Sequence, residues 1–337
     1  LGKVLIRRLL SGELGNPKKV IVFSRDEAKQ HFMRLDYLKK KAATDEIIYQ
    51  NAERVLEFRI GDVRDYGSIA SNLRDVDVVI NAAALKQVPT CEYFPYQAVM
   101  TNIGGPENIV RAIQELQLPI ETVVGVSTDK AAKPVNVMGM TKAIQERIFL
   151  QGNIRCPQTR FLCVRYGNVL ASRGSVIPLF HEQIKAGGPV TITSPEMTRF
   201  LLSLDKAVDT IFAAVRFGNR GETFIPRVAS AKVIDVAKVL IEDRPVEIKV
   251  TGTRPGEKMH EILVSEEERT RTVEVDKYYA IQSILPEIQS RLGQKTPLQN
   301  EYSSSVDLMS IEELDKFLRG YKLMVNDIQI EDGETLR

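Results

Sequence analysis

The chain has 337 residues, 43% of them hydrophobic, with 46 Lys and Arg against 44 Asp and Glu. This length is enough for one large α/β unit and a smaller lobe. The formal net charge of +2 is too small to predict binding to nucleic acid or to a membrane surface. Three cysteines without metal-ligand spacing are typical of a reducing compartment, and no apolar run is long enough to span a membrane. We therefore expect a cytoplasmic protein without a metal site.

Apolar segments alternate with amphipathic ones through the first 230 residues or so. Helices are predicted at 3–11, 26–42, 66–73, 96–117, 138–150 and 204–217. Between them, strands are predicted at 18–24, 54–60, 76–81, 122–127, 161–165 and 222–226. Strands that alternate with helices at this spacing predict an α/β fold with a doubly wound parallel (Rossmann) sheet.

The pattern loosens after residue 231, where Pro and Gly interrupt it, which predicts a smaller C-terminal substrate lobe. The expected division is a dinucleotide-binding domain at 1–166 and 203–231, a substrate-binding lobe at 167–202 and 232–280, and a C-terminal extension at 281–337.

The start of the chain differs from that of a doubly wound fold, which has a central strand and a Gly-rich turn before its first helix. The first strand and the Gly-rich turn are both missing before helix 3–11. We expect about a dozen residues to precede Leu1 in the natural protein, the size of one strand and a short turn. Gly2 would then be the last glycine of that turn.

Several short segments stand where the strand ends of a dinucleotide-binding fold meet the cofactor. Ser24 and Arg25 end one strand and offer a hydroxyl and a guanidinium to a 2′-phosphate, which favours NADP over NAD. An ordinary strand-to-helix turn with solvated charge is the alternative. The small residues after strand 76–81 would let a cofactor approach the backbone, or would only pack a helix terminus. The candidate cofactor contacts are Gly2, Ser24, Arg25, Asp62, Val63, Ala82, Ala83, Ala84, Lys86 and Lys142.

Asp129 and Lys130 directly follow strand 122–127, at the edge where ligands bind in such sheets. An exposed surface ion pair is the alternative, but two charges at the end of an apolar strand are costly unless they serve a site. Lys142 stands four residues after Met138, so the two share one face of a helix. Taken alone, Met138 is more typical of packing than of chemistry.

Arginines next to glycines recur in predicted loops, at 165–169, 173–175, 197–200 and 254–258. Their guanidinium groups suit an anionic diphosphate, although each loop alone is a common surface feature. The three histidines form no visible cluster and are given no metal role. The candidate substrate contacts are Lys86, Tyr166, Asn168, Arg173, Ser175, Val176, Thr191, Arg199, Arg254 and Glu257.

Six segments together resemble the extended short-chain dehydrogenase/reductase superfamily, and within it the inverting UDP-N-acetylglucosamine 4,6-dehydratases (5-epimerases) of capsule and O-antigen biosynthesis. The likeness covers nearly all of residues 1–270. Met138 and Lys142 take the place of the superfamily's Tyr-x-x-x-Lys, as in a Met-x-x-x-Lys subgroup that starts the route to UDP-N-acetyl-L-fucosamine. The segments that carry the resemblance are 23–27, 81–89, 127–131, 165–169, 197–200 and 254–258.

The resemblance implies a tightly bound NADP, UDP-N-acetylglucosamine as substrate, and a homo-oligomer, either a dimer or a hexamer. The implied reaction oxidises carbon 4 of the sugar, removes a proton from carbon 5 and water from carbon 6, then reduces carbon 6 and reprotonates carbon 5 on the opposite face.

In that scheme Lys130 transfers a proton at carbon 5 and Asp129 protonates the departing hydroxide. Partial burial and a nearby Lys142 are expected to lower the pKa of Lys130. Because a thioether cannot accept the proton of the carbon-4 hydroxyl, that proton is assigned to Lys142, to Thr128 or to a water.

Two other functions stay open. A UDP-sugar 4-epimerase would return hydride to carbon 4 on the same fold, but it has no use for an acid and an amine acting at carbon 5, and it would lack its tyrosine. A catalytically silent NADP-binding scaffold or sensor would account for the missing tyrosine.

Overall fold

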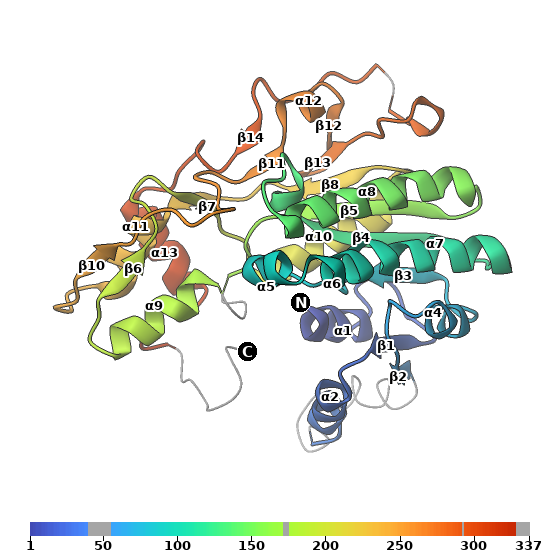
Figure 1. Ribbon diagram of the computed structural model, residues 1–337, viewed down its shortest axis with the longest axis horizontal. Coiled ribbons are helices and arrows are strands. Elements are labelled where there is room, and N and C mark those ends of the chain that lie inside the picture. The colour runs from blue at the N-terminus through green and yellow to red at the C-terminus, as the bar shows by residue number, and fades with distance from the viewer. Residues whose placement is uncertain (40–54, 171–174, 292, 328–337) are drawn as a thin grey trace.

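The computed structural model describes residues 1–39, 55–170, 175–291 and 293–327. Its main sheet has six strands, and helices cover both faces (Figure 1). Strands β8 to β3 run parallel, and β13 and β12 extend the β8 edge as an antiparallel hairpin. The predicted α/β class with a parallel sheet is confirmed. In spatial order the strands are β12 (Thr272–Val275), β13 (Tyr278–Ile281), β8 (Thr223–Pro226), β5 (Arg160–Tyr166), β4 (Thr122–Thr128) and β3 (Val78–Asn81).

A separate parallel pair, β1 and β2, comes from the N-terminal part of the chain and lies below the main sheet in Figure 1. Among the described residues, no hydrogen-bonded ladder joins this pair to the six-stranded sheet. All six strands expected from the sequence start and end within two residues of their predicted bounds. Residues 40–42 of one predicted helix lie outside the described residues. The elements of this part are α1 (Gly2–Leu10), β1 (Val20–Ser24), α2 (Glu27–Lys39), β2 (Leu56–Ile60) and α4 (Tyr66–Asn72).

Three long helices pack on the main sheet: α7 (Gly105–Leu116) and α8 (Val137–Arg155) on one face and α10 (Leu204–Phe217) on the other. Successive side chains of β5 point to opposite faces of the sheet and pack in two separate hydrophobic cores. Phe161 packs with α7 and α8, and Leu162 packs with α10. Gly125 in β4 allows α8 to approach closely, since a Cβ there would lie 2.4 Å from the ring of Phe149. These contacts place the start of α8 next to the end of β4.

The helix predicted at 96–117 is interrupted. The structure has α5 (Val88–Tyr93), α6 (Pro95–Val99), a π-helical turn at Met100–Gly104, and then α7. Within that turn Asn102 is fully buried and bonds the backbone N–H and carbonyl of Leu85 and the hydroxyl of Thr141. A buried amide that satisfies a neighbouring loop gives a physical reason for the irregular turn.

The C-terminal part has a hydrophobic core of its own, built mainly from α9, α11 and α13. The segment expected to be a C-terminal extension packs onto this lobe, because α13 lies against α11 and β14 pairs with β11. The structure also places β12 and β13 in the main sheet, although residues 232–280 were assigned to the lobe. The lobe elements are α9 (Val176–Lys185), β6 (Val190–Ile192), β7 (Thr198–Phe200), β9 (Ser230–Lys232), α11 (Val233–Ile241), β10 (Ile248–Val250), β11 (Ile262–Val264), α12 (Glu266–Arg269), β14 (Tyr302–Ser303) and α13 (Ile311–Gly320).

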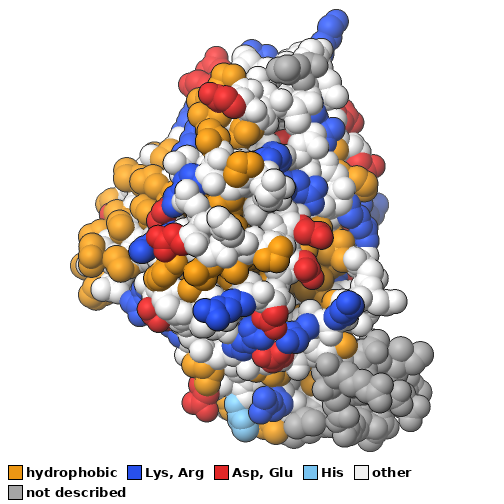
Figure 2. All heavy atoms as spheres, turned by 90° about the vertical axis from the view of Figure 1, so that its right-hand side faces the viewer, with side chains coloured by type: hydrophobic (Ala, Val, Ile, Leu, Met, Phe, Trp, Pro, Cys, Tyr) orange, Lys and Arg blue, Asp and Glu red, His pale blue; other side chains and the backbone are white. Residues whose placement is uncertain are grey.

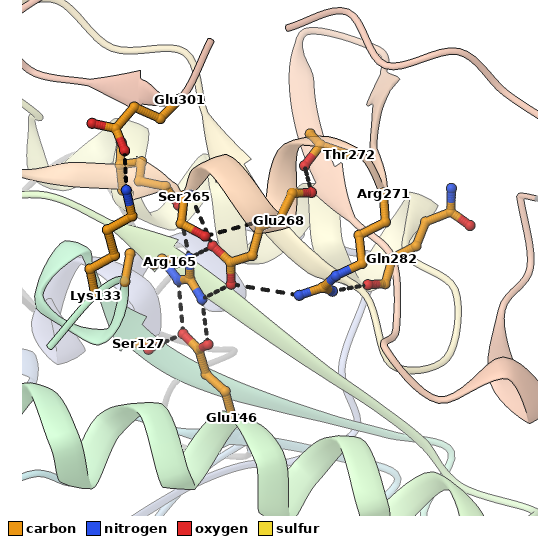
Figure 3. A network of polar contacts seen from close by, with 12 residues as sticks. Ser127, Lys133, Glu146, Arg165, Ser265, Glu268, Arg271, Thr272, Gln282 and Glu301 are labelled. Carbon is orange, nitrogen blue, oxygen red and sulfur yellow. Dashed lines mark hydrogen bonds and ion pairs between the residues drawn. The ribbon is translucent and has the colours of Figure 1, made fainter.

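A buried arginine connects the sheet to both α8 and the C-terminal part (Figure 3). Arg165 in β5 donates to Glu146 of α8 at 2.6 and 3.0 Å and to Glu268 of α12 at 2.8 and 2.9 Å. It also donates to the carbonyl of Leu263, and Ser127 in β4 donates to Glu146. The guanidinium is therefore enclosed by carboxylates from two separate elements.

Glu268→Gln is expected to lower the free energy of unfolding by about 3–5 kcal/mol, because it removes one partner of a buried ion pair. Although burial alone would raise the pKa of Glu268, Arg165 lowers it from 4.5 to about 2. A lowered acid pKa stabilises the fold above about pH 4.5, and this contribution is lost as the pH falls toward about 2. Denaturant unfolding between pH 3 and 7 measures both effects, and Glu266→Gln, an exposed change in the same helix, is the control. Equal effects of the two variants would contradict the prediction.

Candidate active site

The candidate site lies at the carboxyl end of β4, where Thr128 is followed by a short 3-10 turn at Asp129–Ala131. The Thr128 hydroxyl donates to Oδ1 of Asp129 at 2.9 Å and accepts from the backbone N–H of Lys130 at 3.4 Å. Asp129 is fully buried, and the side chain of Lys130 is 20% exposed. The predicted acid is buried and the predicted amine is mostly buried, so the two are not an exposed surface ion pair.

Lys130 is surrounded by acceptors from three parts of the chain. Its Nζ lies 3.1 Å from Oδ1 of Asp129, 3.1 Å from Oε1 of Glu261, and 3.3 Å from Oδ1 of Asn168. Asn168 follows β5, and Glu261 directly precedes β11. Arg199 of β7 lies 3.9 Å from the same carboxylate oxygen of Glu261. The chain thus brings two carboxylates and an amide to one ammonium.

These contacts and the burial of the site shift the pKa values of Asp129, Lys130 and Glu261. Burial raises the pKa of Asp129, against the opposing effect of Lys130. Burial alone would lower the pKa of Lys130, but Asp129 and Glu261 raise it above its ordinary value. Burial would likewise raise the pKa of Glu261, but Lys130 and Arg199 lower it. The expectation that the pKa of Lys130 is lowered is therefore wrong, because two carboxylates face it.

Glu261 is a site residue that the sequence analysis missed. It stands three residues beyond the Arg254–Lys258 segment and before a short apolar strand that was not predicted. An acidic residue directly before an apolar run is a weak signal of the same kind as Asp129 after strand 122–127. Asp129 is next to Lys130 in the sequence, whereas only the fold brings Glu261 to this lysine.

Lys142 and Met138 occupy a different environment. The ammonium of Lys142 donates to the carbonyl of Val126 at 2.5 Å and to Gln145 at 2.6 Å, and burial lowers its pKa to about 8. Met138 is buried against Cys91 and Ala98. Met138 therefore packs against α5 and α6, which agrees with the interpretation of this residue as a packing residue.

The predicted cofactor corner presents polar and small side chains. Arg25 is 57% exposed and lies 3.8 Å from Asp62. Ser24 accepts from the backbone N–H of Asp26.

The residues after β3 form the other part of this corner. Ala82 and Ala84 are exposed, whereas Ala83 is half-buried. Lys86 is exposed, and a Cβ on Gly2 would meet nothing within 4 Å. The carbonyl of Val63 accepts from Asn108.

This corner fits a nicotinamide dinucleotide. Asn81 ends β3, and its buried Nδ2 has no partner among the described residues. An unsatisfied buried donor beside exposed small residues is what a polar ligand lying across the strand ends would complete.

The predicted substrate residues are only partly brought together. Arg173 lies outside the described residues. Thr191 bonds Gln183 within the lobe, Val176 begins α9, and Arg254 is exposed. The loop arginines do not share one role, because Arg165 is enclosed by Glu146 and Glu268 and is unavailable to a diphosphate.

Most of the buried side-chain atoms without a hydrogen-bond partner belong to residues of the candidate site or to its predicted contacts. The described residues contain eight such atoms, and six belong to the site or to its predicted contacts. Buried polar atoms are almost always paired in folded proteins, so this concentration indicates a polar ligand. The six atoms are Asn81 Nδ2, Asp129 Oδ2, Tyr166 Oη, Ser175 Oγ, Glu257 Oε2 and Glu261 Oε2.

The described residues contain neither a metal-ligand cluster nor a membrane-spanning helix. No group of three or more His, Cys, Asp or Glu is arranged to hold a metal ion there. None of the helices in these ranges is long and apolar enough to cross a membrane.

The parallel sheet and the helices on both of its faces define a Rossmann-type α/β protein, with a charged pair at its strand ends. The chain belongs to the polysaccharide biosynthesis protein family, whose family model matches residues 1–283. It is 44% identical over 282 residues to a UDP-glucose 4-epimerase of Rickettsia conorii, an alignment that covers 82% of this chain and 78% of the relative. The corresponding protein of Rickettsia bellii is 42% identical over 286 residues, covering 83% and 79%.

Solved structures give the same fold. Pen from Bacillus thuringiensis has a TM-score of 0.83 at 32% identity, covering 96% of this chain and 95% of that one. The dTDP-glucose 4,6-dehydratase DesIV of Streptomyces venezuelae, solved with NAD bound, has a TM-score of 0.64 at 18% identity, covering 95% and 93%. At that identity the likeness to DesIV shows the fold alone.

Lys142→Met is expected to change how stability depends on pH. Because the pKa of Lys142 falls from 10.5 to about 8 on folding, the unfolded chain binds the extra proton between these values. The wild type should therefore gain about 3 kcal/mol of unfolding free energy between pH 8 and 10.5, relative to the variant. Urea unfolding across this range measures the gain. The exposed change Lys206→Met should keep the wild-type slope, and a Lys142→Met variant with that same slope would refute the prediction.

Proposed function

We propose that the protein is an inverting 4,6-dehydratase (5-epimerase) that converts UDP-N-acetylglucosamine to a UDP-4-keto-6-deoxy-L-sugar. Its cofactor is NADP in preference to NAD, and its reaction starts a route to UDP-N-acetyl-L-fucosamine-type sugars of surface polysaccharide. The observation that carries the proposal is the buried Asp129–Lys130 pair at the end of β4. Loss of water and inversion at carbon 5 need one proton for the hydroxide that leaves carbon 6 and one for carbon 5, and this pair supplies a donor for each.

A nicotinamide cofactor held by Arg25, Asp62 and the Ala82–Ala84 segment would supply the hydride transfer that oxidises carbon 4 and reduces carbon 6. The exposed guanidinium of Arg25 supports NADP, because it is free to meet a 2′-phosphate beyond its 3.8 Å contact with Asp62.

The hydrogen bond from Thr128 to Asp129 supports a route for the proton of the carbon-4 hydroxyl. Thr128 accepts that proton and passes its own to Asp129, which then gives it to the hydroxide leaving carbon 6 as water. The raised pKa of Asp129 suits a carboxyl group that first accepts a proton and then donates one. A water on one face of the sugar takes the proton lost from carbon 5 during the elimination. Lys130 stays an ammonium until it delivers the proton that inverts carbon 5 from the opposite face.

A UDP-sugar 4-epimerase is the second candidate, and the names of the Rickettsia relatives favour it. An epimerisation at carbon 4 leaves carbon 5 untouched, so it gives the Asp129–Lys130 pair no task. A catalytically silent NADP-binding scaffold is the third candidate.

One incubation separates the three. UDP-N-acetylglucosamine and NADP are added to the protein in D₂O, and the sugar nucleotide is analysed by mass spectrometry and NMR. The dehydratase gives a product that has lost one water and carries deuterium at carbon 5. An epimerase product keeps its mass and its carbon-5 proton, and a scaffold yields no new sugar; either outcome overturns the proposal.

Asp129→Asn and Lys130→Ala should each lower kcat for dehydration by about 10²–10⁴-fold, the usual worth of one general acid or base. Lys133→Gln is the matched control, because this neighbouring lysine pairs with Glu301 instead of entering the buried cluster. Retention of full turnover by both site variants, with unchanged cofactor binding, would rule out the assigned roles.

A homo-oligomer, either a dimer or a hexamer, is part of the proposal. Hydrophobic side chains gather along one flank of the molecule in Figure 2. Large apolar side chains are exposed on α5, α6 and α8 and in the segment between α5 and α6, and such surfaces support association. They are Tyr93, Phe94, Tyr96, Met140 and Ile144.

A further inference from the structure

Glu261 is held firmly beside Lys130 by contacts that do not involve the lysine. Its backbone N–H donates to Oγ of Ser304 at 2.9 Å, and its carbonyl accepts from the N–H of Ser304 at 2.8 Å. Ser304 is itself fully buried and shares a hydrogen bond of 2.7 Å with Thr198. The backbone of Glu261 is therefore fixed, and its carboxylate lies with Oε1 on Lys130 and Oε2 buried without a partner.

Four charged groups act on Lys130. Asp129 and Glu261 contact its Nζ directly and favour the ammonium. Arg199, on β7, opposes it. Lys258, which donates to the carbonyl of Ala132, is a second cation close enough to interact with Lys130. Without Glu261, a single carboxylate would have to offset burial and both cations, so Glu261 decides the balance.

We propose that Glu261 is a positioning residue that keeps Lys130 in its ammonium form and aims it into the site. This inference rests on the proposed function, in which Lys130 acts as the proton donor to carbon 5. The donated proton comes from the N–H bond of the ammonium and forms the new C–H bond, which leaves a neutral amine beside Glu261. Solvent then returns a proton to the amine, and the Glu261 carboxylate restores the ion pair.

The test measures the titration of Lys130 without any substrate. The protein is labelled with trace acetic anhydride at a series of pH values, and acetylation of Lys130 is followed by mass spectrometry, because only the neutral amine reacts. Glu261→Gln is expected to move the midpoint of this reaction down by about 1–3 pH units, the range for loss of a close opposite charge. Glu301→Gln is the matched control, since it removes the carboxylate partner of Lys133 and should leave the Lys130 midpoint unchanged.

The midpoint is expected to fall because the two carboxylates raise the pKa of Lys130. A lysine whose pKa is raised by two carboxylates stays charged to high pH, so losing one carboxylate makes it neutral, and reactive, at lower pH. In the active enzyme, the alkaline fall of kcat should move by the same amount and in the same direction. A purely structural role for Glu261 would lower stability and leave both midpoints in place, and that result would overturn the inference.

Glu261→Asp covers the case in which the glutamine variant does not fold. It keeps the charge but shortens the side chain, so the midpoint should fall by less than in the glutamine variant, or not at all, while turnover falls because the ammonium is displaced. An aspartate variant with wild-type turnover and midpoint would also overturn the inference. The labelling result does not depend on the reaction, so a wild type that fails to dehydrate UDP-N-acetylglucosamine overturns the proposed function alone.

Discussion

The enclosure of Arg165 by Glu146 and Glu268 is the interaction on which the site depends. Burial of a guanidinium and two carboxylates is costly, and here the geometry offsets that cost with two hydrogen bonds to each acid. Because Arg165 lies in β5, Glu146 in α8 and Glu268 in α12, the ion pairs fix the C-terminal part against the sheet. Because the C-terminal part is held in this position, Glu261, directly before β11, contacts Lys130 after the end of β4.

The two buried charge clusters serve different ends. Around Arg165 both acids are paired with that cation, Glu268 also lies 3.9 Å from Arg271, and both acids accept further hydrogen bonds within the chain. Around Lys130 both acids keep one buried oxygen without a partner, and the amine is partly exposed. The Arg165 cluster, whose acids are fully paired, stabilises the fold. The Lys130 cluster, whose acids each keep an unpaired oxygen, leaves hydrogen-bonding capacity for a ligand. The contrast separates structural charge from candidate catalytic charge within one sheet.

Local patterns in the sequence predicted what local forces determine. The strands were placed within two residues, and the Asp129–Lys130 pair was identified because charges at the end of an apolar strand need an explanation. Patterns that depend on distant segments were missed. Arg165, the last residue of predicted strand 161–165, was grouped with the loop arginines, but two distant acids enclose it. The helix predicted at 96–117 contains a π-helical turn around the buried Asn102. The pKa of Lys130 was misjudged because Glu261 comes from a remote part of the chain.

The position of Lys130 between Asp129 and Glu261 also constrains how such a site is able to change over evolutionary time. Removal of the lysine charge alone would leave two buried acids that repel each other, and removal of either acid alone would favour loss of the ammonium. A substitution at any one of the three positions therefore alters the charge balance felt by the other two. We expect the three positions to vary as a set among related chains, although two are adjacent in the sequence and 130 residues separate Lys130 from Glu261.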